Sequence, residues 1–145
     1  MDFLFHFSAI SVLPFWGLMI LLPKSNFSSR VVASPWIILP PTLCYLAFLI
    51  PNLPAAFASF ENPSPQSLAG MMAQPWAASL FWAYAGAFDL FVGRWIFFDA
   101  RERGISAGYT LPILLICIFF GPLAFPLYAL ARAANAYRLR VRVDT

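Results

Sequence analysis

Long apolar runs separated by short polar segments dominate the pattern of this chain. Four of the runs have the length of a membrane crossing, which takes about 20 residues of helix. They cover residues 3–22, 32–50, 75–98 and 111–131. A water-soluble core of this size would leave large apolar patches exposed. We therefore expect an all-α integral membrane protein, a four-helix bundle forming one transmembrane domain over residues 1–145.

Between the second and third runs, a short segment has its apolar residues on one helical face. They recur at positions i, i+3, i+4 and i+7: Leu53, Ala56, Phe57 and Phe60. This spacing is typical of a helix lying in the membrane surface. The Asn-Pro-Ser-Pro sequence at 62–65 then breaks the pattern. We expect an interfacial helix over 53–60, which either covers one end of the bundle or only connects two spans.

Prolines occur in three of the four predicted spans: Pro14, Pro40, Pro41, Pro122 and Pro126. Inside a helix, each removes a backbone donor and disturbs the carbonyl four residues earlier. In a membrane that carbonyl must be satisfied by a neighbouring helix, a water or a ligand. The pattern predicts Pro-kinked helices that open around something, although proline is also simply common in membrane helices.

The composition supports the membrane class and excludes several kinds of site. The chain is 61% hydrophobic and 10% charged, against about 25% charged in soluble domains. It has no Gly-rich phosphate loop, Ser-His-Asp set or metal-ligand cluster, so no metal or nucleic acid is expected. Cys44 and Cys117 are expected to behave as small hydrophobes. His6 is the only histidine; it could ligate a chlorophyll magnesium, but an unpaired histidine at the interface is more common.

The start of the chain does not resemble a cleavable signal or transit peptide. No Lys or Arg precedes the first run, and no small-residue cleavage site follows it. We expect the first helix to remain as an anchor in a bacterial or organelle-encoded chain, or in one already processed.

The distribution of basic residues gives two conflicting signals for orientation. The positive-inside rule would place both short basic loops in the cytoplasm or stroma; these hold Lys24, Arg30, Arg101 and Arg103. The basic tail would then lie on the opposite side, with Arg132, Arg138, Arg140 and Arg142. We favour the orientation given by the loops. The tail either rests on anionic headgroups or a partner, or is simply solvated.

The third run carries charges that a chain this apolar could have avoided. Asp89 and Arg94 lie inside it and Asp99 directly follows. Such a charge costs roughly 2.5–3.5 kcal/mol at the centre of a bilayer unless it has a partner or a wet cavity. Asp89 and Arg94 are about 140° apart around the helix, so they are not a natural pair. We expect their partners on other helices or on a ligand, with a buried structural pair as the alternative. Asp99 is one turn from Arg103 and can pair with it locally.

The face of this helix that holds Asp89 also carries Trp82, Ala85, Gly86 and Gly93. The glycines would let a neighbouring helix or a flat ligand approach closely.

Three segments give the chain a family resemblance. The stretch from Trp82 to Gly104 contains Asp-Leu-Phe, an Arg five residues after the Asp, and a second Asp five residues later. Together with Val-Leu-Pro-Phe at 12–15 and Phe-Gly-Pro-Leu at 120–123, it resembles the abscisic-acid-deficient-four-like family of small membrane proteins. Plant members are linked to neoxanthin formation from violaxanthin. The chain departs from the expected pattern at Tyr84, where a His is expected, and at Ala124, where a Gly is expected.

The resemblance implies a carotenoid-related protein that isomerises an epoxy-xanthophyll, with Asp89 and Arg94 as catalytic groups. The substrate would contact five further residues: Trp82, Tyr84, Gly86, Gly93 and Asp99. An isomerisation requires no redox cofactor, although a carotenoid or chlorophyll could be bound. The alternative is a non-enzymatic pigment-binding protein or a small accessory subunit of a larger photosynthetic membrane complex. Either version implies a thylakoid or other photosynthetic membrane, with lipid and xanthophyll as partners.

Overall fold

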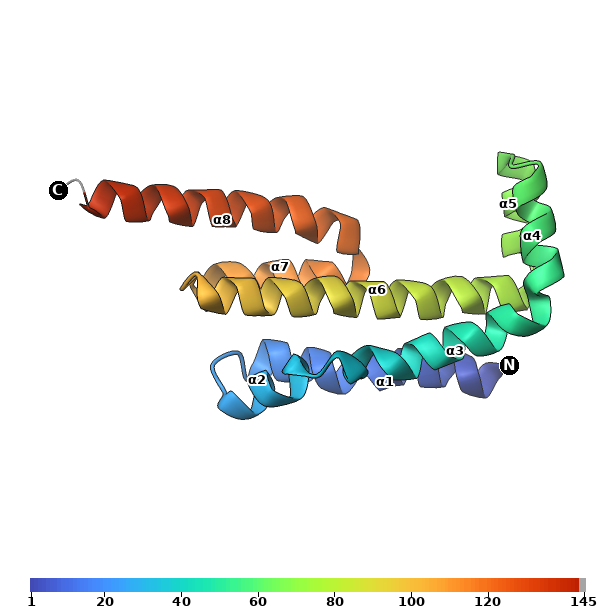
Figure 1. The fold of residues 1–145 in the computed structure, drawn as a ribbon, viewed down its shortest axis with the longest axis horizontal. Coiled ribbons are helices and arrows are strands. Elements are labelled where there is room, and N and C mark those ends of the chain that lie inside the picture. The colour runs from blue at the N-terminus through green and yellow to red at the C-terminus, as the bar shows by residue number, and fades with distance from the viewer. Residues whose placement is uncertain (144–145) are drawn as a thin grey trace. The chain divides into compact units, whose positions relative to one another are not determined.

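The protein is all-helical over the residues that the structure describes. A computed structural model gives the backbone of residues 1–143 and the side chains of residues 1–139. The helices are α1 Asp2–Leu21, α2 Asn26–Ala33, α3 Leu39–Leu49, α4 Leu53–Glu61, α5 Pro65–Met72, α6 Pro75–Glu102, α7 Ala107–Phe119 and α8 Gly121–Val143 (Figure 1). Short 3₁₀ turns at Pro35–Ile38 and Ile50–Asn52 flank α3.

The chain divides into two compact units. The first holds Met1–Pro14 and Pro35–Ala87, and the second holds Phe15–Ser34 and the residues from Phe88 onward. In the first unit, the start of α1, α3 and the start of α6 share an apolar cluster: Leu4, Cys44, Tyr45, Phe48, Leu80 and Ala83. Cys44 is thus the small buried hydrophobe that was expected. His6 is exposed. It is not unpaired, because its Nδ1 donates to the Asp2 carbonyl oxygen at 2.8 Å.

Two helical runs in the described chain are long and apolar enough to cross a membrane, judged by length and composition: Asp2–Leu21 and Pro35–Glu61. The first matches the predicted span 3–22. Helix α6 contains the predicted span 75–98 and extends to Glu102, but its charges keep it out of this apolar class. The all-helical class is therefore confirmed, and the four-helix membrane bundle stays a prediction.

The second predicted span, 32–50, has different boundaries in the structure. Helix α2, which the sequence pattern missed, ends at Ala33, and Ser34 is extended. A residue before proline is biased away from helical angles, so the chain breaks there. The following run passes through the predicted interfacial segment 53–60 and ends with α4. Pro40 lies in the first turn of α3, where a missing donor costs nothing, so no proline kink arises there.

The fourth predicted span, 111–131, is not one helix. Phe120 has non-helical angles (φ −141°, ψ 61°), and Gly121 starts α8 with Pro122 in its first turn. Helices α7 and α8 pack against each other as a hairpin (Figure 1). The 13 residues of α7 fall short of the roughly 20 that a crossing requires. Pro122 therefore begins a helix instead of kinking one, whereas Pro14 and Pro126 lie inside helices as expected.

Helix α5 follows directly on the predicted break at 62–65. Ser64 accepts a hydrogen bond from the Ser67 N–H at 3.0 Å, and the Ser67 hydroxyl accepts one from the Ser64 N–H at 3.0 Å. This reciprocal capping box satisfies two donors at the start of the helix. The proline at 65 occupies the first turn, so the same residues that end one helix begin the next.

Gly104 ends α6 with a left-handed residue, φ 62°. The Gly104 N–H donates to Arg101 O at 3.2 Å and the Ile105 N–H to Ala100 O at 2.8 Å, the two bonds of a Schellman cap. We expect Gly104→Ala to lower the free energy of unfolding by about 1–2 kcal/mol, because a Cβ is strained at this φ. The matched change Gly17→Ala, inside α1 with open space around it, should be neutral or stabilising. Equal destabilisation by both in detergent unfolding experiments would contradict this account.

Candidate functional site

Arg94 on α6 is held by the end of α2. Its Nε donates to Val32 O at 2.7 Å and its Nη2 to Ala33 O at 2.6 Å. These two carbonyls belong to the last turn of α2, where the helix itself supplies no N–H donor to them. The guanidinium also lies over the Phe98 ring, 5.4 Å from its centroid. Arg94 therefore caps a helix end, and it has no ion pair with Asp89 among the described residues.

Arg101 makes the corresponding contact at the other end of α2. Its Nη1 donates to the carbonyl oxygen of Pro23, in the connection between α1 and α2. Its guanidinium lies over the Phe97 ring at 5.4 Å. Two arginines of α6, seven residues apart, thus hold both sides of the short α2 segment.

Gly93 admits a side chain from α1. The ring of Trp16, which is 4% exposed, lies so close that a Cβ at Gly93 would overlap its Cη2 and Cζ3 atoms. The close approach expected at this glycine therefore occurs, but the space is filled by the chain's own indole. The sequence signal for this contact was a glycine on a face shared with aromatic residues, which does not identify the partner.

Asp89 has an unusual environment for a charged residue. Its carboxylate is half-buried and packs against Gly121, where an added Cβ would overlap Oδ1. Among residues 1–139, its side chain makes no hydrogen bond or ion pair. Its backbone oxygen lies 3.5 Å from the buried Cys117 thiol, which donates to it. The carboxylate thus lies against the first residue of α8.

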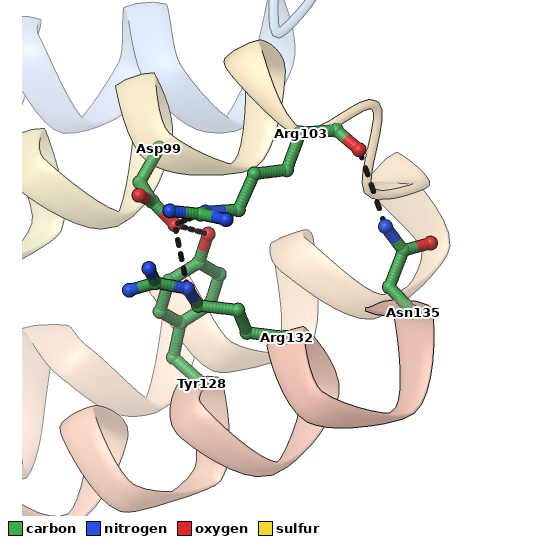
Figure 2. A network of polar contacts seen from close by, with 5 residues as sticks. All are labelled: Asp99, Arg103, Tyr128, Arg132 and Asn135. Carbon is green, nitrogen blue, oxygen red and sulfur yellow. Dashed lines mark hydrogen bonds and ion pairs between the residues drawn. The ribbon is translucent and has the colours of Figure 1, made fainter. Parts of the chain in front are cut away.

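Asp99 is the centre of a polar network between α6 and α8 (Figure 2). Its Oδ2 accepts hydrogen bonds from the Tyr128 hydroxyl at 2.6 Å and from Arg103 Nε at 2.8 Å. Arg132 Nε lies 3.8 Å from the same oxygen, and Asn135 donates to Arg103 O at 3.2 Å. The predicted Asp99–Arg103 pair is confirmed. Tyr128 and Arg132 were missed, because nothing local in sequence links them to Asp99.

Two opposing effects act on the Asp99 carboxylate, which lies beyond the predicted span 75–98. Burial would raise its pKa, but hydrogen bonds from Tyr128 and Arg103 and the charges of Arg103 and Arg132 bring the pKa below its ordinary value. Asp99 is therefore ionised at neutral pH. The Tyr128 ring is fully buried and meets Trp95 edge-on, with centroids 5.4 Å apart. This network joins α6 and α8, and the predicted contact of Asp99 with a substrate stays a prediction.

The remaining predicted site residues belong to the first unit. The Trp82 ring lies 5.8 Å from Phe5, and the Tyr84 ring lies 6.4 Å from Tyr45. Both rings are about half exposed. Gly86 has open space where a side chain would be. The structure thus gives Arg94 and Asp99 well-defined hydrogen-bond partners. It gives the Asp89 side chain no such partner among residues 1–139 and leaves open space beside Gly86.

No metal centre is present in the part of the chain that the structure describes, since no three His, Cys, Asp or Glu side chains converge. Both cysteines are free and buried, and Cys117 is the small buried group that was expected. Of the basic tail, Arg132 and Arg138 bind within the second unit, to Asp99 and to the Tyr109 hydroxyl. The side chains of Arg140 and Arg142 lie outside the described residues.

Comparison with known proteins gives one family and one curated relative. The family model described as ABA DEFICIENT 4-like matches residues 3–128. The protein named Protein ABA DEFICIENT 4, chloroplastic, from Arabidopsis thaliana is 25% identical over 142 residues, covering 92% of this chain. The chain spans 63% of the length of that relative. No solved structure matches.

The contact between Asp89 and Gly121 can be tested by adding one methyl group. We expect Gly121→Ala to destabilise the fold by about 1–3 kcal/mol, because the new Cβ would overlap the carboxylate. Gly86→Ala, on the open part of α6, should be neutral. The double change Asp89→Ala with Gly121→Ala should recover much of the loss, since Asp89→Ala removes the carboxylate that the new Cβ would overlap. Additive effects in a double-mutant unfolding cycle would show that the two residues are not in contact.

The bond from Tyr128 to Asp99 should contribute measurably to stability. Tyr128→Phe keeps the buried ring and removes only the donor, so we expect a loss of about 1.5–3 kcal/mol, typical of a hydrogen bond to a charged group. Tyr137→Phe, at a ring that is 70% exposed, is the control and should change little. Comparable losses for both in chemical unfolding would show that the hydroxyl at 128 is not a structural donor.

Proposed function

We propose, from the premise that the chain belongs to the ABA DEFICIENT 4-like family, that it is a carotenoid-related membrane protein that isomerises an epoxy-xanthophyll. The reaction would be of the violaxanthin-to-neoxanthin type, in a plastid or other photosynthetic membrane. The chloroplastic relative supports the compartment. Because the chain covers only 63% of that relative, its activity and substrate are parts of this proposal.

The exposed apolar surface supports placement in a bilayer. Only 22% of the apolar window in Asp2–Leu21 and 17% of that in Pro35–Glu61 is buried. Large side chains such as Phe3 and Leu21 are more than three-quarters exposed. A soluble monomer rarely shows contiguous patches of this kind. We infer that these two runs and α6 contact lipid, as parts of the expected membrane bundle.

The observation that carries the catalytic proposal is the unpaired carboxylate of Asp89. A carboxyl group can donate or accept a proton as a general acid or base. The other acidic side chains of α6 are paired, as Asp99 is, or lie at its exposed end, as Glu102 does. The contact of Asp89 with Gly121, at the start of α8, fixes where the carboxylate lies. The group is therefore held in position without being consumed by a structural ion pair.

The proposed chemistry moves protons and needs no redox cofactor. A base removes the proton at C7 of the xanthophyll, the C6–O bond of the 5,6-epoxide breaks, and an acid protonates the oxygen that stays on C5. The product is an allene with a hydroxyl group. We assign one of the proton transfers to Asp89. Asp99 is about 15 Å further along α6. It accepts hydrogen bonds from Tyr128 and Arg103 and pairs with Arg132, so we do not assign it the second proton transfer.

Arg94 has a double role in this proposal. Two of its five N–H groups bind the end of α2, and the other three remain able to hold a hydroxyl or a developing negative charge. Trp82, Tyr84 and Gly86 stay candidate substrate contacts, because both rings are half exposed and Gly86 has open space beside it. Gly93 and Asp99 support the site indirectly, since one receives Trp16 and the other binds Tyr128.

The alternative is a pigment-binding protein or accessory subunit without turnover. Half-exposed aromatic rings on α6, such as Phe81, Trp82 and Phe91, suit a bound carotenoid or chlorophyll, or a larger membrane complex, as well as they suit a substrate. Pigment that co-purifies unchanged would favour this version. Conversion of added epoxy-xanthophyll by the purified protein would favour the enzyme.

The decisive variant is Asp89→Asn, expressed in a host from which the gene has been deleted. Because the carboxylate has no partner, the change should cost under about 1 kcal/mol of stability and leave abundance normal while xanthophyll conversion is lost. Glu102→Gln, at the exposed end of the same helix, should leave both unchanged. Arg94→Lys should lower abundance, because an ammonium cannot bind both α2 carbonyls in the geometry of a guanidinium. Full conversion with Asp89→Asn would remove Asp89 from the mechanism.

A further inference from the structure

The second unit contains a cavity that the proposed reaction does not use. It has a volume of about 630 Å³, within the usual range of ligand sites. It is formed by the end of α1 and the connection after it, the last turns of α6 and the start of α7. Neither Asp89 nor Arg94 lines it. The cavity is therefore separate from the site of the proposed reaction.

The polar part of the cavity is positively charged. Lys24 and Arg101 line it, and no Asp or Glu does. Among the described residues, the Lys24 ammonium has no hydrogen bond or ion pair. Arg101 uses one N–H group on Pro23 and lies flat over Phe97, so most of its donors remain available. Two cations with no local counter-charge favour an anion.

The rest of the lining is apolar. Pro23, Ala107 and Leu111 keep part of their surface exposed along it, while Met19, Phe97 and Leu114 lie buried behind them. A small soluble anion would leave the exposed parts of Pro23, Ala107 and Leu111 in contact with water. A molecule with an anionic head and a hydrocarbon chain would satisfy both parts of the lining at once.

We propose that this cavity binds an anionic membrane lipid. The phosphate of its headgroup lies between Lys24 and Arg101, and part of its chain lies on the Ala107 and Leu111 side. A free phosphate would share only the anionic group with this lipid. The apolar wall favours the lipid, because a free phosphate has no chain to cover it. A neutral xanthophyll end group would leave both cations without a counter-charge. The inference relies on the membrane placement proposed above but on no catalytic role.

The test uses the full chain in uncharged detergent micelles, titrated with phosphatidylglycerol, with phosphatidylcholine and with inorganic phosphate. Binding is read by native mass spectrometry and by the shift in unfolding temperature. We expect phosphatidylglycerol to bind at least several-fold more tightly than phosphatidylcholine. Lys24→Gln should weaken its affinity about fivefold, as one basic group near an anionic lipid contributes about 1 kcal/mol.

The matched control is Arg30→Gln. It removes the same charge at an exposed position of α2 that does not line the cavity. It should change the affinity less than twofold, while Lys24→Glu should weaken it more than Lys24→Gln. Equal effects of the changes at 24 and 30 would indicate general surface attraction and overturn the site. Equal binding of the two lipids, or of inorganic phosphate and phosphatidylglycerol, would overturn the lipid assignment. None of these readouts depends on xanthophyll conversion, so failure here leaves the proposed reaction untouched.

Discussion

The carboxylate of Asp99 is the point on which the packing of the second unit depends. A charge in so apolar a chain is stable only if its hydrogen-bonding capacity is filled. One oxygen of Asp99 accepts from Tyr128 and Arg103 and lies near Arg132. Because Tyr128 and Arg132 both belong to α8, satisfying this single group fixes α8 against α6. The hairpin of α7 and α8 follows, since the chain must turn at Phe120 to bring α8 back.

The three charges of the α6 motif have three different environments. Asp99 is neutralised by side chains, and Arg94 is used on backbone carbonyls at the end of α2. Asp89 alone has neither kind of partner in the described chain, and lies at the beginning of α8 instead. Structural roles account for the first two charges without a ligand. Asp89 is the remaining charge, and no contact in the described chain explains its presence in an apolar helix. The proposed chemistry is assigned to it for this reason.

The short α2 segment shows how a polar contact can be made where a pattern of hydrophobicity gives no signal. Its eight residues are too few to be stable as an isolated helix. Arg94 and Arg101 bind carbonyl oxygens on both sides of it, and Ser25 caps its start by accepting from the Phe27 N–H at 3.1 Å. Tertiary hydrogen bonds thus stabilise a helix that the sequence pattern represents only as a loop.

The sequence by itself determined the features that depend on composition and on neighbours along the chain. Apolar runs predicted an all-helical protein, and the spacing of Asp99 and Arg103 predicted their bond, since residues four apart meet on any helix. Only the tertiary structure decided the rest. The helix break at Phe120 is one such feature. Two contacts join residues far apart in sequence: the indole of Trp16 lies on Gly93, and the Asp89 carboxylate lies on Gly121. A glycine reveals that something approaches closely but not what does. The identity of each partner is set by packing, because many apolar side chains could fill the same space and the fold selects one.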